Sequence, residues 1–309
     1  MRGSRARTLI LRYHRVADLQ RDPNGIAVSV RHFEEHLEVL CRRFQPVPLE
    51  AVVAGIAAGR VPDRGVALTF DDGYADVIHP VRPLLERYDV PATVYIVTGT
   101  LAGDREHWWD VLERVFATDP LPSRLEITIG RSRLGFDLGP GPTGNGAGPP
   151  VKAFRTLFER LRRLAAPARE DAMARLVDWA RLSPGVRSSH RLLGPADIVA
   201  LDRSSPVAIG AHSVTHPMLT HLRPPRRREE IGASKQTLEA LVGHSITSFA
   251  YPFGTGTTSA GMVRQAGFRS ACTTRDGAVN GRADPWRLPR IYVGDWDGEE
   301  LERRLAHLS

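Results

Sequence analysis

Short apolar segments alternate with stretches of helical periodicity along most of this chain. Such alternation is typical of an α/β fold built around a mostly parallel sheet. Seven apolar segments are too many for a small sandwich layer and favour closure of the sheet into a barrel. The predicted strands are Thr8–Arg12, Val66–Phe70, Ala92–Val97, Val207–Gly210, Thr247–Ala250, Arg269–Thr273 and Leu288–Val293.

Helices are expected between these strands. The first follows Ser29, whose side chain suits an N-cap, and carries Phe33, Leu37 and Leu40 on one face. The others are expected at Asp76–Tyr88, Arg226–Val242 and Thr258–Ala266.

The alternation breaks between Leu101 and His190. The segment Leu138–Pro150 is so rich in glycine and proline that we expect a flexible loop there. We interpret residues from about 102 to 190 as a helical, arginine-rich insertion into a single domain that spans 1–309. The helices expected inside it are Trp108–Phe116 and two amphipathic helices around Val151–Ala165 and Ala168–Arg181.

The composition excludes several protein classes. Hydrophobic residues make up 42% and charged residues 25% of the chain, which is unlike a disordered, collagen-like or coiled-coil protein. The longest stretch without formal charge, Ala240–Val263, is rich in Gly, Ser, Thr and Pro and does not fit a membrane helix. After the basic start, the apolar run Leu9–Leu11 is too short for a signal peptide. We therefore expect a cytoplasmic protein.

The formal net charge is +7, and much of it comes from arginine runs. Between Val151 and Arg191 there are ten basic and four acidic residues, and Arg226–Arg228 form a second run. Such surfaces attract nucleic acid, acidic lipid head groups or phosphorylated substrates. The alternative is a solvated arginine-rich helix face. No nucleic-acid-binding module accompanies the charge, so no specific nucleic-acid partner is expected.

The segment Val66–Tyr74 combines an apolar strand with an abrupt polar end. Two carboxylates, Asp71 and Asp72, and then Gly73 follow Phe70 directly. Adjacent side chains at a strand end can point in different directions, so one carboxylate can bind a metal while the other faces substrate. The carboxyl ends of parallel strands are also where α/β folds place their sites. The alternative is that one aspartate only caps the next helix.

A second polar cluster follows the strand that ends at Gly210. His212 and His216 are four residues apart, a spacing that places both imidazoles on one side of a helical turn. A histidine pair alone is more often structural. Together with a carboxylate from Asp71 or Asp72, two neutral imidazoles make a three-ligand site with a position left for water, as in catalytic zinc sites. The two strand ends therefore predict a metal site.

These two motifs resemble those of the polysaccharide deacetylase family, carbohydrate esterase family four. The resemblance covers Thr8–Leu101 and about Leu192–Val293. It implies a distorted (β/α)7 barrel and a divalent metal ion, usually zinc. It also implies that Asp71 is the general base. The metal ligands that it implies are Asp72, His212 and His216.

Two further family motifs are altered in this chain. Ala250 stands where the family's base-orienting arginine would be, so that role is vacant or filled from elsewhere. The family resemblance implies the backbone N–H of Phe253 as an oxyanion donor. The strand Leu288–Val293 lacks the family's histidine acid. Arg290, on this strand, is expected to orient the site or to bind substrate.

His14, after the first strand, is the best candidate for the missing acid. A nearby carboxylate such as Asp71 is expected to raise the pKa of His14 and keep a proton available near neutrality. The alternative is a packed histidine that takes no part in the reaction.

Four aromatic residues are candidates for substrate binding. Trp108 and Trp109 open the insertion, and sugar rings stack on such side chains, although paired tryptophans are more often core residues. Tyr74 and Tyr251, which lie within or beside the motifs, complete the set.

The resemblance and these residues together predict a metal-dependent N-deacetylase. Its substrate would be an amino sugar in a polysaccharide, an oligosaccharide or an activated precursor. The expected partner is therefore an N-acetylated carbohydrate, and the arginine runs would suit an anionic or lipid-linked substrate near the membrane surface. The alternatives are a deformylase or other non-peptide amide hydrolase of the same fold, and a non-catalytic carbohydrate-binding relative. Retention of Asp71 with all the metal ligands argues against the last, because binding alone needs no base.

Overall fold

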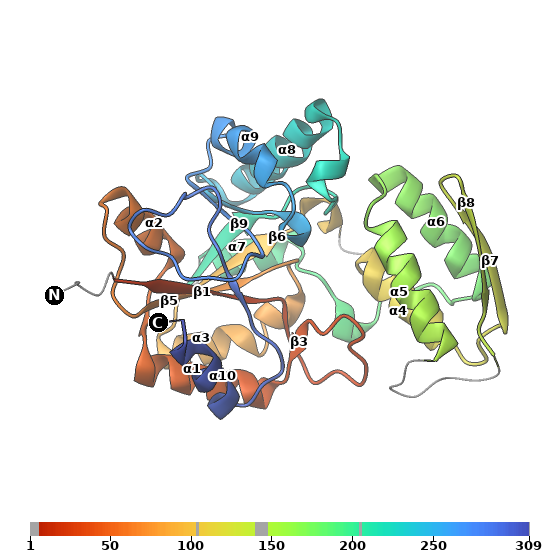
Figure 1. Ribbon diagram of the computed structural model, residues 1–309, viewed down its shortest axis with the longest axis horizontal. Helices are drawn as coiled ribbons and strands as arrows, with labels where there is room; N and C mark the ends of the chain where they lie inside the picture. Colours follow the sequence, from red (N-terminus) through yellow and green to blue (C-terminus); the bar gives the residue numbers. More distant parts are fainter. Residues whose placement is uncertain (1–5, 103–104, 140–147, 204–205, 309) are drawn as a thin grey trace. The chain divides into compact units, whose positions relative to one another are not determined.

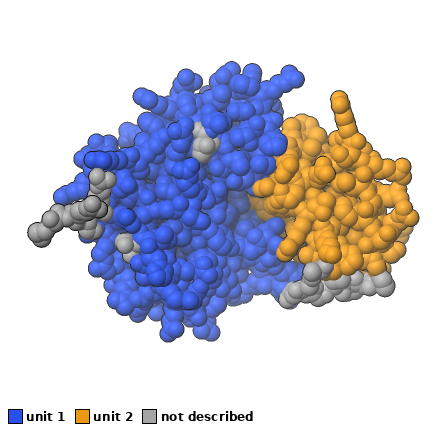
Figure 2. Space-filling model, in the orientation of Figure 1, with its two compact units in different colours: residues 1–103, 191–309 blue, residues 104–190 orange. Residues whose placement is uncertain are grey.

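The computed structural model describes residues 6–102, 105–139, 148–203 and 206–308. The chain forms two compact units, which Figure 2 colours separately: unit 1, residues 1–103 with 191–309, and unit 2, residues 104–190. None of the helices in the described ranges has the length and hydropathy that crossing a membrane requires. The interpretation of unit 2 as an insertion into a single domain stays a prediction.

Unit 1 is built around one sheet. Its strands are β1 (Thr8–Tyr13), β4 (Gln45–Pro46), β5 (Gly65–Phe70), β6 (Ala92–Ile96), β9 (Val207–Ala211), β10 (Ser248–Ala250), β11 (Ser270–Cys272) and β12 (Ile291–Tyr292). Their order is β11-β10-β9-β6-β5-β1-β12, with β4 beside β5 off this path, and the pairings are parallel. Every predicted strand is present, and β4 is an addition. A separate two-stranded pair is formed by β2 (Arg15–Val16) and β3 (Ala27–Val28).

Hydrogen bonds also join the two ends of the sheet. The N–H of Leu288 donates to Ala271 O over 2.9 Å, and the N–H of Thr273 donates to Leu288 O over 2.8 Å. The chain leading into β12 therefore pairs with β11, while β12 itself pairs with β1. The sheet curls into a distorted barrel (Figure 1), as the sequence predicted.

Helices cover the outside of this sheet. They are α1 (Val30–Arg43), α2 (Leu49–Ala57), α3 (Val81–Tyr88), α7 (Pro195–Asp202), α8 (Pro224–Val242), α9 (Ala260–Gln265) and α10 (Gly298–Ala306). In Figure 1, α1, α3 and α10 lie together on one side of the sheet, and α8 and α9 lie on the opposite side. The helix predicted at Asp76–Tyr88 is interrupted, because Pro80 has no N–H to continue a helix, and α3 starts only at Val81.

Side chains on the two faces of the sheet enter different cores. Along β1, Leu11 and Tyr13 belong to the core beneath the outer helices, where the ring centroids of Tyr13 and Phe33 are 5.5 Å apart. Ile10 belongs instead to the core inside the barrel, together with Tyr95 of β6. Both faces are therefore buried, as expected for a parallel sheet.

Unit 2 has a hydrophobic core of its own. Its elements are α4 (Trp108–Ala117), β7 (Arg124–Ile129), β8 (Ser132–Asp137), α5 (Pro149–Leu161) and α6 (Ala166–Trp179). The antiparallel β7–β8 hairpin was not predicted. Most of the predicted loop Leu138–Pro150 lies outside the described residues, and α5 already begins at Pro149.

Candidate active site

The backbone turns sharply after β5. The N–H of Asp71 donates to Tyr13 O over 3.0 Å and extends the pairing with β1 by one residue. Asp72 and Gly73 then both adopt φ of 72°, in the left-handed region. This conformation is costly for a residue with a Cβ and is concentrated at functional sites. It sends the carboxylates of Asp71 and Asp72 to different partners.

The loop after β9 carries the two histidines. They do not lie on a helical turn, as the spacing had predicted, because no helix forms between His212 and His216. Instead, Ser213 and His216 adopt φ of 65° and 51°, and the Ser213 hydroxyl accepts the His216 N–H over 3.1 Å. The buried carboxylate of Glu230, on α8, accepts the N–H groups of Val214 and Thr215 over 2.9 and 2.8 Å. This loop brings the two imidazoles together.

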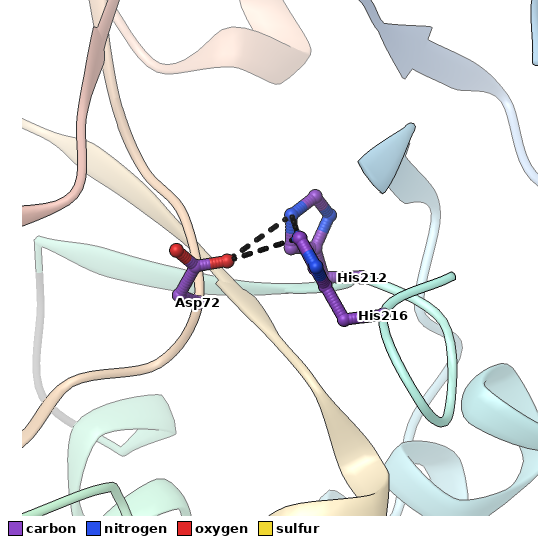
Figure 3. Close-up of side chains that lie close together, drawn as sticks. All are labelled: Asp72, His212 and His216. Atoms are coloured by element: carbon purple, nitrogen blue, oxygen red, sulfur yellow. Dashed lines mark hydrogen bonds and ion pairs between the residues drawn. The ribbon is translucent and has the colours of Figure 1, made fainter. Parts of the chain in front are cut away.

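Asp72, His212 and His216 form a buried cluster (Figure 3). The Nε2 atoms of the two histidines are 3.2 Å apart, and they lie 3.4 Å (His212) and 3.3 Å (His216) from Asp72 Oδ1. Ligand atoms of a tetrahedral ion with bonds of about 2.0–2.1 Å are about 3.3–3.4 Å apart. The three donors therefore have the spacing of three corners of a tetrahedral zinc-like site, with the fourth corner left for water or substrate.

The charge state of the cluster also fits a metal site. Burial lowers the pKa of His212, but Asp72 and Asp71 raise it more. His212 Nδ1 is 2.8 Å from Ala250 O, and because a carbonyl only accepts, Nδ1 carries the proton in the neutral ring, which leaves the Nε2 lone pair for a metal. Burial raises the pKa of Asp72, but His216 and His212 lower it more, so this pKa lies well below its usual range. Asp72 is thus ionised, as a metal ligand has to be.

Arg290 holds the other carboxylate. Its Nη1 and Nη2 donate to Oδ1 and Oδ2 of Asp71, each over 2.7 Å, and Arg290 is fully buried. Its Nε donates to Thr273 O over 2.9 Å, and Nη1 also reaches Thr69 Oγ1 at 3.0 Å. Burial raises the pKa of Asp71, but Arg290 lowers it to about 2. Of the two roles expected for Arg290, these contacts fit the orienting role that Ala250 cannot fill, and a contact with substrate stays a prediction.

His14 lies between β1 and β2, close enough to the aspartates for their charges to act on it. Its Nδ1 is buried and has no hydrogen-bond partner among the residues that the structure describes. The expected direction of its pKa shift is wrong. Burial lowers the pKa of His14, and although Asp72 and Asp71 raise it, the net shift is downward. The role of His14 as the acid stays a prediction.

The remaining candidates of unit 1 differ in their placement. Phe253, with φ of 55°, packs its ring against His216 at a centroid distance of 4.6 Å, and the oxyanion role of its N–H stays a prediction. Tyr74 and Tyr251 are fully buried. The ring of Tyr74 lies 4.4 Å from the guanidinium of Arg15, and the Tyr251 hydroxyl donates to a backbone carbonyl. Both tyrosines thus have packing contacts, and substrate binding by either of them stays a prediction.

Trp108 and Trp109 lie in unit 2, at the start of α4. Trp109 is buried and stacks on His107 with ring centroids 4.2 Å apart. Trp108 packs edge-on against Trp109 and lies 5.1 Å from the ring of Phe158. Both rings thus contribute to packing within unit 2, and a contact with sugar stays a prediction.

Comparison with known proteins agrees with this geometry. The family model for polysaccharide deacetylases matches residues 58–119 and 183–271. The chain belongs to the polysaccharide deacetylase family. The residues between the two matched ranges lie in unit 2.

Individual relatives are distant. The putative polysaccharide deacetylase YxkH of Bacillus subtilis (strain 168) is 30% identical over 104 residues, which span 33% of this chain and only 36% of that protein. The Streptococcus pyogenes deacetylase PplD, solved in complex with acetate, has a TM-score of 0.63 at 17% identity, covering 97% of this chain and 98% of that chain. IcaB from Ammonifex degensii has a TM-score of 0.61 at 18% identity, covering 96% of each chain. The two solved structures show that the fold is shared.

Proposed function

We propose that this protein is a metal-dependent hydrolase that removes N-acetyl groups from an amino-sugar substrate. The observation that carries the proposal is that two adjacent carboxylates, Asp71 and Asp72, have different partners. Asp72 lies with His212 and His216 at the spacing of three ligands of a tetrahedral metal ion. Asp71 is instead paired with Arg290, which keeps its carboxylate ionised. A carbohydrate-binding protein would need neither feature.

The residues around the cluster divide the remaining chemistry. A divalent ion, for which we propose zinc, would supply Lewis acidity towards the amide carbonyl and its attacking water. Asp71 is placed to accept the proton of that water, and Arg290 fixes the direction of its carboxylate. The N–H of Phe253 would donate to the developing oxyanion. The departing amine would take up the proton that Asp71 accepted, either directly from Asp71 or through His14, so the products are acetate and a free amino sugar.

Hydrolysis of a matched panel tests the proposal. Zinc-loaded protein is incubated with N-acetylated and N-formylated forms of the same amino sugars, as free sugars, nucleotide sugars and oligosaccharides. Mass spectrometry then measures the amine, acetate and formate. We expect acetate release that the Asp71→Asn variant loses. Formate release alone would replace the proposal with a deformylase, and binding without hydrolysis of any member would favour a non-catalytic relative.

A further inference from the structure

Arg12 is a charged residue on the inner face of the barrel. In the parallel register of the sheet it lies opposite Thr69 of β5 and Tyr292 of β12. Two residues earlier, Ile10 belongs to the core inside the barrel. Because side chains alternate along a strand, Arg12 points to the same inner side, and His14 follows two residues later. Arg12 therefore lies at the carboxyl end of the barrel, next to the candidate active site.

No carboxylate of the described chain forms an ion pair with Arg12. Its Nε is inaccessible to solvent and has no hydrogen-bond partner. Its terminal nitrogens also lack partners in the described ranges, yet they are not among the buried unpaired atoms, so solvent reaches them. The guanidinium lies over the ring of Tyr292, 5.5 Å from its centroid. The stem of Arg12 is thus fixed while its end is open.

The charges around Arg12 do not compensate its partly buried guanidinium. The largest influence is burial, which lowers the pKa of Arg12, and the second is the positive charge of Arg290, which also lowers it. Asp71 acts in the opposite direction, but both of its oxygens already accept bonds from Arg290. The exposed Asp276 also raises this pKa without forming an ion pair. A partly buried cation normally has a partner. A ligand could supply the partner that the described fold does not.

We propose that Arg12 binds an anionic oxygen group, a phosphate or a carboxylate, that is part of the substrate. The inference rests on the proposed function, because it takes the carboxyl end of the barrel as the place where substrate binds. The two terminal nitrogens of an arginine form a planar fork that pairs with two oxygens of a carboxylate or phosphate. The substrate class is then an amino sugar that carries or adjoins an acidic group.

Probes without an amide test this inference independently of hydrolysis. Isothermal titration of the zinc-loaded protein measures the affinity for glucose 1-phosphate, for glucuronate and for glucose. We expect at least one anion to bind about 10-fold or more tightly than glucose, and the pair of anions distinguishes a phosphate from a carboxylate. Arg12→Gln should weaken anion binding about 10- to 100-fold, the range for a charge-assisted contact, without affecting glucose.

Two further variants make the result specific. Arg12→Lys keeps the charge but loses the fork, so we expect an intermediate affinity, and this variant serves if Arg12→Gln does not fold. Arg60→Gln removes an equal charge from an exposed residue before β5, at the opposite end of that strand, and should bind anions like the wild type.

Two outcomes would overturn the inference: equal affinity for glucose and both anions, or unchanged anion affinity in both Arg12 variants. The second outcome would show that the metal or another cation holds the anion. Acetate release is measured separately. Anion binding by Arg12 without acetate release refutes the proposed function alone, whereas acetate release without an anion preference refutes this inference alone.

Discussion

Replacing Arg290 with glutamine should disable the proposed base without removing the metal ligands. Arg290 and Asp71 are both buried and share two hydrogen bonds of 2.7 Å. Removing one partner of a buried ion pair costs about 3–5 kcal/mol, because the other charge is left without compensation. Burial alone raises the pKa of Asp71. In Arg290→Gln the carboxylate is therefore protonated at higher pH, and the acid limb of the pH–rate profile should move upwards.

The expected kinetic effect is large. A positioned base contributes about 10²–10⁴ to a rate, so we expect turnover in Arg290→Gln to fall by about 10² or more with bound metal unchanged. Arg290→Lys keeps the charge but loses the paired geometry. It should lose less stability than Arg290→Gln, and its turnover should remain measurable. Arg282→Gln removes an equal charge from an exposed residue and serves as the control. Urea unfolding measures the stability, elemental analysis the bound metal, and acetate release the turnover. Wild-type stability and turnover in Arg290→Gln would refute the positioning role.

Three further predictions concern other parts of the chain. His14→Ala should lower turnover by about 10²–10⁴ with bound metal unchanged, and a normal rate in the folded variant would exclude it as the acid. Burial lowers the pKa of His36 to about 4. The folded state therefore favours neutral His36, so the free energy of unfolding should fall by up to about 3 kcal/mol as the pH drops from about 6.5 to about 4. His36→Gln should flatten this slope in urea titrations, and an unchanged slope would refute the assignment. Leu157→Ala in the unit 2 core should lower the free energy of unfolding by about 2–5 kcal/mol, whereas wild-type stability would show that this core contributes little.

Local sequence patterns were sufficient to predict the strands and the cluster of candidate metal ligands. The apolar runs ending at Phe70 and near His212 predict where the sheet stops, and the residues that follow them in sequence also meet in space. The loop conformation that brings His212 and His216 together was not predictable in the same way. His212 and His216 meet because Ser213 adopts a left-handed conformation and Glu230 holds the loop, and neither feature has a periodic signal.

Contacts between distant strands have no local signal in the sequence. The carboxylate of Asp71 is held by Arg290, 219 positions away along the chain, because β12 closes the barrel beside β1. Arg12 was missed, although a charged residue near the end of an apolar strand was a visible signal. The β7–β8 hairpin was missed too, although Leu125 and Ile127 alternate with exposed residues in the manner of a half-buried strand.

The metal content of single variants at the two adjacent aspartates tests most directly which carboxylate binds the metal and which acts as the base. Wild-type protein, Asp72→Ala and Asp71→Asn are loaded with zinc, dialysed and examined by elemental analysis beside an acetate-release assay. We predict about one ion per chain in the wild type and in Asp71→Asn, and almost none in Asp72→Ala, with turnover lost in both variants. Retention of metal by Asp72→Ala, or loss of metal from Asp71→Asn as complete as from Asp72→Ala, would contradict the division of roles between the two carboxylates.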